Sequence, residues 1–136
     1  MKTIVVGFDG SPAAERALER AAGLSGQDGR VVIVTATVTV QAAGIVDEPI
    51  LVSPSPDERD ALLEDGAGRL RAAGVEARAV AVDSGPAEAL VEVARAEGAD
   101  LIIVGSTGSG YVTRAIIGST AENVVRQAPC DVLVVR

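Results

Sequence analysis

LIIVGSTGSG, residues 101–110, decides the fold, because a run of apolar residues passes directly into a loop that contains three glycines. Four apolar residues without alternation are typical of a strand that helices cover on both faces. Glycines permit positive φ angles and let backbone amides approach a ligand without interference from a Cβ atom. In a parallel α/β sheet, such a strand end predicts a ligand site.

Four further runs rich in Val and Ile share this strand-like character. The five predicted strands are Thr3–Phe8, Arg30–Val38, Val75–Val82, Leu101–Val104 and Asp131–Val135. A segment with helical periodicity lies between each strand and the next, so the order alternates from end to end. Right-handed crossovers then give an α/β fold, a Rossmann-like, doubly wound parallel sheet with helices on both faces.

Start and stop signals delimit the four predicted helices. The first begins at Ser11-Pro12, with a hydroxyl at the N-cap and proline at the first helical position. Ser55 and Glu58 form a capping box for the second helix, which ends at Gly74. The third runs from Pro86 to Gly98, and a second capping box, Ser119 to Glu122, opens the fourth.

The connection Thr39–Pro54 is longer than the usual link between a strand and a helix. Two interpretations stay open for it, a lid over the ligand site and a mobile excursion. The chain as a whole, 136 residues, fits one domain spanning residues 1–136.

Composition excludes several classes of protein. Twelve basic and 19 acidic residues give a net charge of −7, so neither nucleic acid nor an anionic membrane is an expected partner. The chain has no Trp, one Phe and one Tyr, which excludes a site built on stacked rings. It also has no His, which excludes the Ser/His/Asp and Cys/His nucleophile systems and the usual zinc sites.

A reducing compartment is consistent with the sequence, and we expect a cytoplasmic protein. The only cysteine, Cys130, is predicted to be a small core residue rather than a redox centre. The N-terminus starts directly on the apolar run Thr3–Phe8, so no signal peptide is expected. No stretch reaches the roughly 20 apolar residues that a membrane span needs.

The glycine loop and the following helix start together suit a phosphate chain. Gly105 and Gly108 are followed by Gly118, which nine residues separate from Gly108 and which precedes Ser119-Thr120. A helix N-terminus supplies unpaired N–H groups and a partial positive charge. Neutral hydroxyl donors stand at Ser106, Thr107, Ser109, Ser119 and Thr120. The alternative is that the glycines only make a flexible connection, because the spacing matches neither the dinucleotide-binding fingerprint nor the P-loop.

The pattern Gly105-x2-Gly108-x9-Gly118-Ser119 resembles the universal stress protein family, in its ATP-binding branch. The stretch IVVGFDGSPAAERAL, residues 4–18, and the C-terminal segment from Pro129-Cys130 match the same family, so the resemblance spans Lys2 to Arg136. It implies an adenine-nucleotide-binding stress-response domain, usually dimeric and cytoplasmic. It also implies a five-stranded sheet in the order 3-2-1-4-5.

Carried over by position, the resemblance implies a set of ligand contacts. Asp9 would accept hydrogen bonds from ribose hydroxyls or hold the base, although an Asx turn that only shapes residues 9–11 also explains it. The backbone of Ala36 would meet adenine. The complete predicted cofactor-binding set is Asp9, Gly10, Ser11, Ala36, Val104, Gly105, Ser106, Gly108, Gly118, Ser119 and Thr120. The cofactor would be ATP, with Mg²⁺ or Mn²⁺ bound through its phosphates.

One departure from the family pattern concerns the charge near the phosphates. A basic residue often follows the second glycine in this family, and Ser109 stands there instead. Arg114 is the basic residue that could replace it, although an isolated Arg in a loop is more often solvated. No protein metal site and no catalytic residue are predicted.

The sequence therefore predicts a nucleotide-dependent stress-response or signalling module rather than a rapid enzyme. The last strand, Asp131–Val135, is expected at a sheet edge, where antiparallel pairing with a second copy would give a homodimer. The alternatives are a nucleotide-free dimeric interaction module and a slow ATPase or autophosphorylating protein. An electron-transfer flavoprotein-like domain is a further alternative, which the lack of aromatic residues disfavours.

Overall fold

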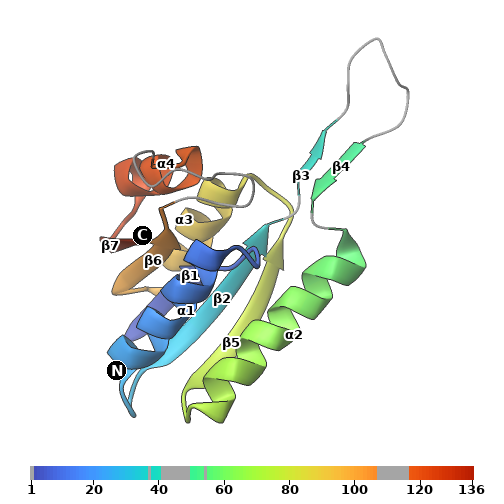
Figure 1. Cartoon of the computed structure of the whole chain (residues 1–136). Coiled ribbons are helices and arrows are strands. Elements are labelled where there is room, and N and C mark those ends of the chain that lie inside the picture. The colour runs from blue at the N-terminus through green and yellow to red at the C-terminus, as the bar shows by residue number, and fades with distance from the viewer. Residues whose placement is uncertain (1, 37, 41–49, 54, 107–116) are drawn as a thin grey trace.

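A five-stranded parallel sheet forms the centre of the computed structural model, which describes residues 2–36, 38–40, 50–53, 55–106 and 117–136 (Figure 1). Its strands are β1 (Thr3–Gly7), β2 (Arg30–Ala36), β5 (Glu76–Val82), β6 (Leu101–Gly105) and β7 (Asp131–Val135). They are ordered β5-β2-β1-β6-β7, which is 3-2-1-4-5 along the chain. The predicted fold class is confirmed, and the order reverses between β1 and β6, where a crevice is expected.

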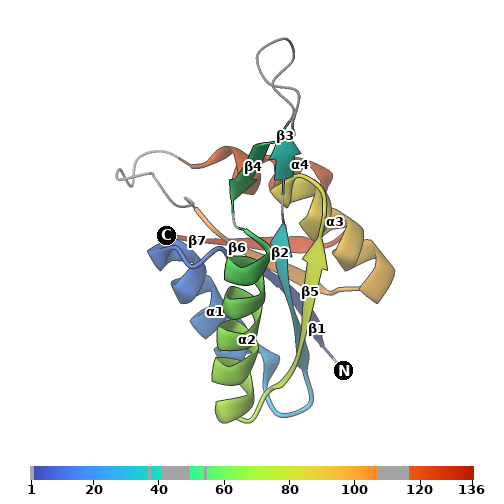
Figure 2. The same ribbon diagram turned by 90° about the vertical axis from the view of Figure 1, so that its right-hand side faces the viewer.

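Helices cover both faces of this sheet. They are α1 (Pro12–Ser25), α2 (Pro56–Ala72), α3 (Pro86–Glu97) and α4 (Ser119–Gln127). α1 and α2 pack on one face, and α3 and α4 pack on the other (Figures 1 and 2). None of the helices in the described ranges is long and apolar enough to cross a bilayer.

Each face of the sheet has its own buried core. Ile4, Val6 and Ile33 point toward α1 and α2, whereas Val5, Val32 and Ile102 point toward α3 and α4. Successive strand residues alternate between faces, so a strand covered on both sides must be apolar at every position. This packing accounts for the uninterrupted apolar runs in the sequence.

Three of the four helix starts agree with the sequence prediction. The hydroxyl of Ser11 accepts a hydrogen bond from the amide of Ala14 at 3.2 Å, and the hydroxyl of Ser55 accepts one from the amide of Glu58 at 3.2 Å. α3 begins with Pro86, as predicted. Gly98, with a φ of 62°, ends that helix in the left-handed conformation that favours glycine.

The predicted capping box at the start of α4 is wrong. The N-cap is Gly118, Ser119 is the first helical residue, and no side chain caps this end among the described residues. The cause is a tertiary contact, because the amide of Gly118 donates to the carbonyl of Ser106 at 2.6 Å. That bond fixes Gly118 in an extended conformation and starts the helix one residue earlier than a Ser119 cap requires.

The connection after β2 also differs from the prediction. β2 ends at Ala36 rather than Val38, and β3 (Val38–Val40) pairs antiparallel with β4 (Ile50–Ser53). Figure 1 shows this hairpin extending beyond the carboxyl ends of the sheet strands. The predicted loop therefore contains two short strands, whose β-branched residues favour this structure. The lid hypothesis depends on residues 41–49, which lie outside the described residues.

Cys130 lies just before β7 and packs, partly buried, against the core on the α3 and α4 side. Burial, and then the neighbouring carboxylates Asp131 and Asp100, raise the pKa of its thiol. The thiol therefore stays protonated at neutral pH, which suits a packing role and not a reactive one.

Candidate functional site

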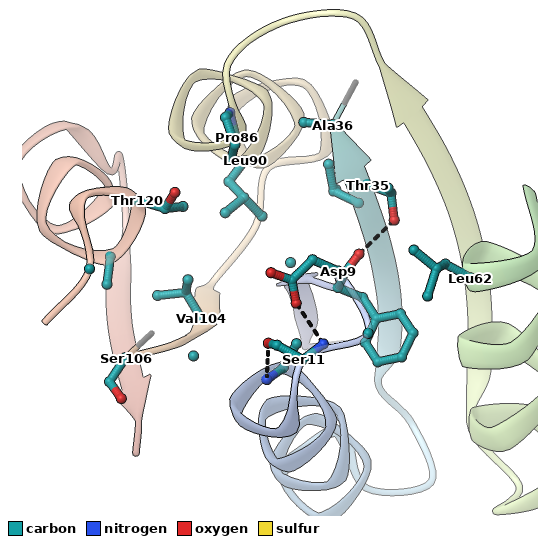
Figure 3. A pocket seen from close by; sticks show the side chains of 18 of the residues that line it. Asp9, Ser11, Thr35, Ala36, Leu62, Pro86, Leu90, Val104, Ser106 and Thr120 are labelled. Atoms are coloured by element: carbon teal, nitrogen blue, oxygen red, sulfur yellow. Dashed lines mark hydrogen bonds between the residues drawn. The ribbon is translucent and has the colours of Figure 1, made fainter. Parts of the chain in front are cut away.

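A cavity of about 800 Å³ opens at the carboxyl ends of β1, β2 and β6. It spans the switch point of the sheet and is lined from both faces (Figure 3). Its walls come from the turn between β1 and α1, from the end of β2, from α2 and α3, and from the segment that joins β6 to α4. This is the place where α/β sheets of this kind bind their ligands.

Asp9 stands at the centre of this cavity, just beyond the end of β1. One of its carboxylate oxygens accepts a hydrogen bond from the amide of Ser11 at 2.9 Å. The other oxygen is directed into the pocket (Figure 3). Both interpretations of Asp9 are therefore compatible, since the Asx turn forms with one oxygen and the second oxygen remains available to a ligand.

The turn that carries Asp9 depends on a glycine and on a helix cap. Gly10 has a φ of 81°, and a Cβ atom at this position would lie 2.9 Å from Cδ2 of Leu62. Ser11 is only 4% exposed, and its hydroxyl caps α1. Gly10 and Ser11 thus shape the wall of the pocket and fix the first turn of α1.

The opposite wall is formed by the end of β6 and the start of α4. The amide of Ser106 donates to the carbonyl of Val135 at 2.7 Å, which ties this segment to β7. The first intrahelical bond of α4 runs from the amide of Glu122 to the carbonyl of Gly118. The amides of the first turn, beginning with Ser119 and Thr120, therefore have no partner within the helix and no capping side chain among the described residues. Such amides form an anion-binding site when they face a cavity.

Gly105 brings these two walls together. A Cβ atom at Gly105 would lie 2.8 Å from Cβ of Ala13 and 2.9 Å from its carbonyl carbon. Only glycine allows α1 to pack this closely against the end of β6. The N-termini of α1 and α4 consequently face the same cavity.

An aliphatic slot forms a third part of the site. Ala36, Pro86 and Leu90 gather on one side of the cavity, and Val104 lies across from them (Figure 3). Leu90 rests on Gly7, where a Cβ atom would be 3.2 Å from Cδ1 of the leucine. A flat heterocycle fits between aliphatic side chains without an aromatic partner, because burial of its faces is itself favourable.

The charge of the cavity is acidic. Asp9, Glu58 and Asp65 contribute carboxylates, and no Lys or Arg occurs among the described lining residues. Glu58, Leu62 and Asp65 lie on one stripe of α2 and were not predicted as site residues from the sequence. Their spacing of i, i+4 and i+7 predicts a shared helix face. Nothing in the sequence shows that this face turns toward the pocket.

The structure places ten of the predicted site residues around this single cavity: Asp9, Gly10, Ser11, Ala36, Val104, Gly105, Ser106, Gly118, Ser119 and Thr120. Gly108 lies outside the described residues, as do Thr107, Ser109 and Arg114. The described part of the chain has no cluster of three or more His, Cys, Asp or Glu side chains arranged to hold a metal ion.

The sheet order and the cavity at its switch point define a Rossmann-like α/β protein. The chain belongs to the universal stress protein family, whose model matches residues 1–136. A universal stress protein of Mycobacterium tuberculosis is 37% identical over 142 residues, covering 98% of this chain and 95% of its own length.

Solved structures of the same family have the same fold. A crystal structure of a universal stress protein in complex with cAMP is 30% identical, with a TM-score of 0.74, and covers 99% of this chain and 97% of its own. A protein of the family from Burkholderia pseudomallei is 29% identical with a TM-score of 0.66, covering 98% of this chain and 95% of its own.

Proposed function

We propose that the protein binds an adenine nucleotide in this cavity, and that the nucleotide is ATP with Mg²⁺ or Mn²⁺ held through the phosphates. One observation carries the proposal. The free carboxylate oxygen of Asp9 and the uncapped N-terminus of α4 line one cavity from different walls (Figure 3). A ribose phosphate requires two features, an acceptor for its hydroxyls and a site for its anion. The sheet holds these two features apart.

The proposed orientation follows from the three walls of the pocket. Adenine lies in the aliphatic slot, beside the backbone of Ala36. The ribose hydroxyls donate to Asp9. The phosphates lie against Gly105, Ser106 and the first turn of α4, and Gly108 is proposed to contribute from the loop between them. Support comes from the related structure with bound cAMP, which is also an adenine nucleotide.

The net charge of −7 does not oppose this orientation. At physiological salt the Debye length is about 8 Å, so carboxylates on distant surfaces are screened. A helix N-terminus acts at contact distance, where it stabilises a nearby negative charge by about 0.3 to 1 kcal/mol. The divalent cation would neutralise part of the phosphate charge next to Asp9. The pocket is thus suited to retention of the nucleotide, and we propose a signalling or stress-response role in the cytoplasm for this one domain.

We further propose a homodimer formed through β7. This strand lies at the edge of the sheet, and its residues Val132, Leu133 and Val134 are only partly buried. Helix α4 packs beside β7, and its apolar residue Val125 is 56% exposed. An unpaired edge next to apolar surface invites antiparallel pairing with a second copy. Light scattering on the purified protein tests this assembly, and a monomer at 100 µM would contradict it.

Isothermal titration calorimetry tests the nucleotide site. The purified protein is titrated with ATP, AMP and cAMP, each with and without Mg²⁺, and the Gly118→Val variant serves as a comparison. We expect micromolar binding that Mg²⁺ strengthens for ATP, and a loss of at least tenfold in the variant. No binding of any nucleotide at 1 mM to a folded protein would favour the nucleotide-free interaction module. Release of ADP well above the variant's rate would instead establish an ATPase.

A further inference from the structure

We propose that Thr35 is a positioning residue, which holds Asp9 in the orientation that meets the nucleotide. The inference rests on the proposed function for the role of Asp9. Thr35 lies near the end of β2, is 3% exposed, and also lines the cavity. Its hydroxyl donates a hydrogen bond to the carbonyl of Phe8 at 2.7 Å (Figure 3).

This bond controls the peptide that leads into Asp9. Strand β1 ends at Gly7, which is paired with Val34, so the chain leaves the sheet at Phe8. The amide of Phe8 still donates to the carbonyl of Val34, at 3.0 Å. The carbonyl of Phe8 has the hydroxyl of Thr35 as its partner. Because that carbonyl and the amide of Asp9 belong to one planar peptide unit, fixing the carbonyl fixes the direction in which Asp9 leaves the strand.

Hydrogen bonds on the other side of Asp9 complete the restraint. The carboxylate accepts from the amide of Ser11, and the hydroxyl of Ser11 accepts from the amide of Ala14. Asp9 is thus held between the end of β2 and the first turn of α1. One carboxylate oxygen is used by the turn, and the other keeps a single direction into the pocket.

The chemistry of position 35 supports this role over simple packing. Residues Val31–Val34 of the same strand are apolar and buried, and a valine has nearly the shape of a threonine. A buried hydroxyl is costly unless it has a partner. The partner of the Thr35 hydroxyl is the carbonyl of Phe8, the residue directly before Asp9. Replacing the hydroxyl with a methyl group leaves that carbonyl without its partner and lets the peptide rotate.

The chain offers a matched control for this substitution. Thr3 is also buried, at 6% exposure, and its hydroxyl accepts a hydrogen bond from Nε of Arg30 at 3.1 Å. It lies at the amino end of β1, the opposite end of the strand from Asp9. Thr3→Val therefore removes a buried hydroxyl and its bond without acting on Asp9.

The experiment compares Thr35→Val, Thr35→Ser and Thr3→Val. We expect Thr35→Val to weaken ATP binding about fivefold, Thr35→Ser to restore it to within twofold, and Thr3→Val to leave it unchanged. In an Asp9→Ala background, Thr35→Val should change affinity less than twofold, because the group it positions is gone. Two results would overturn the role of Thr35. One is an equal loss of affinity in Thr35→Val and Thr3→Val, and the other is a loss from Thr35→Val that is just as large in the Asp9→Ala background.

A second measurement does not depend on nucleotide. Hydrogen exchange of the Ser11 amide reports its bond to Asp9 directly. We expect Thr35→Val to accelerate this exchange at least tenfold in the free protein, and Thr3→Val to leave it within twofold. An unchanged Ser11 amide overturns the inference, whether or not the wild-type protein binds ATP. Absence of ATP binding with accelerated exchange would instead refute only the proposed function.

Discussion

The N-termini of α1 and α4 face the same cavity and are built in opposite ways. The α1 end is closed by its own residues, since the hydroxyl of Ser11 caps it, Pro12 occupies its first position, and Asp9 binds the amide of Ser11. The α4 end has Gly118 as its N-cap and no capping side chain among the described residues. The first residue of α1, α2 and α3 is proline, whereas α4 begins with Ser119, which keeps its N–H group.

This difference separates two tasks within one site. The closed end of α1 holds Asp9 in place, and its polar groups are satisfied by the protein itself. The open end of α4 leaves amides that have neither an intrahelical partner nor a side-chain cap among the described residues, so they are available to a ligand. The end of α1 is thus suited to orienting Asp9, whereas the proposed ligand would supply acceptors to the first-turn amides of α4.

The largest expected effect comes from pushing the two helix ends apart. Gly105→Ala places a Cβ atom within 2.9 Å of the backbone of Ala13, so the first turn of α1 must move. We expect the free energy of unfolding to fall by about 2 to 3 kcal/mol, as for other overpacked sites. Chemical denaturation of the purified variant measures the change.

Gly68→Ala provides the control for this prediction. Gly68 lies within α2, and a Cβ atom there would meet nothing within 4 Å. Alanine should raise stability by up to about 1 kcal/mol at a helical glycine. A Gly105→Ala variant as stable as the wild type would show that α1 is not held against β6 as the structure has it.

The next effect is on affinity alone. Ser119→Pro removes an N–H group and a hydroxyl from the open end of α4, at the helical position that proline tolerates best. Gly118 has φ −65° and ψ 160°, a conformation that is compatible with a following proline. We expect ATP to bind about tenfold more weakly, equivalent to about 1.4 kcal/mol, with stability unchanged within about 0.5 kcal/mol. Calorimetry and denaturation measure the two quantities separately.

The outcome of Ser119→Pro shows whether the first amide of α4 binds the phosphates. Unchanged ATP affinity in a folded variant would mean that the first amide of α4 makes no contact with phosphate. Ser119→Ala removes the hydroxyl but keeps the amide, so its smaller loss of affinity measures the hydroxyl alone.

A smaller effect should separate the two helix ends by stability. Ser11→Ala removes the cap of α1, and loss of such a cap costs about 1 kcal/mol. Ser119→Ala removes a hydroxyl that caps nothing, so we expect a change below about 0.3 kcal/mol. Thermal and chemical denaturation of the pair test the difference. Equal losses would indicate that Ser119 caps α4 in solution, as its sequence pattern suggested.

The failure to predict the start of α4 shows what local sequence cannot contain. Ser119 and Glu122 fit the capping-box pattern, and the same pattern at Ser55 and Glu58 does place the cap correctly. The difference is the bond between Gly118 and the carbonyl of Ser106, which joins residues 12 positions apart. Propensity within one turn of helix cannot register a tertiary contact of this kind.

The fold itself was more accessible, because each strand carries its own signal. The apolar runs identify the five strands of the parallel sheet, and the glycine pattern identifies the family. The hairpin of β3 and β4 was missed because Val38 continues the apolar pattern of β2. The α2 wall was missed for a different reason. That Leu62 reaches Gly10 depends on how α2 packs against the sheet, and residue order does not determine this angle.

The smallest expected effect concerns the one charge in the first turn of α4. Glu122 lies in that turn, and its carboxylate accepts from Nη2 of Arg126 at 2.8 Å, with both side chains more than half exposed. An exposed pair of this kind contributes at most about 0.5 kcal/mol, so Glu122→Gln should barely alter stability. The substitution also removes a negative charge that competes with phosphate for the positive helix end.

We therefore expect Glu122→Gln to bind ATP up to about twofold more tightly at low salt, with no difference at 0.5 M NaCl, where screening removes the charge effect. Glu92→Gln, on the outer face of α3 and away from the cavity lining, is the matched control. The direction of the change in ATP affinity is the informative result. Weaker binding in Glu122→Gln would mean that the carboxylate of Glu122 favours ATP binding, for example through the cation. Phosphate would then be held mainly by the metal, and the open helix end would contribute less than its unpaired amides suggest.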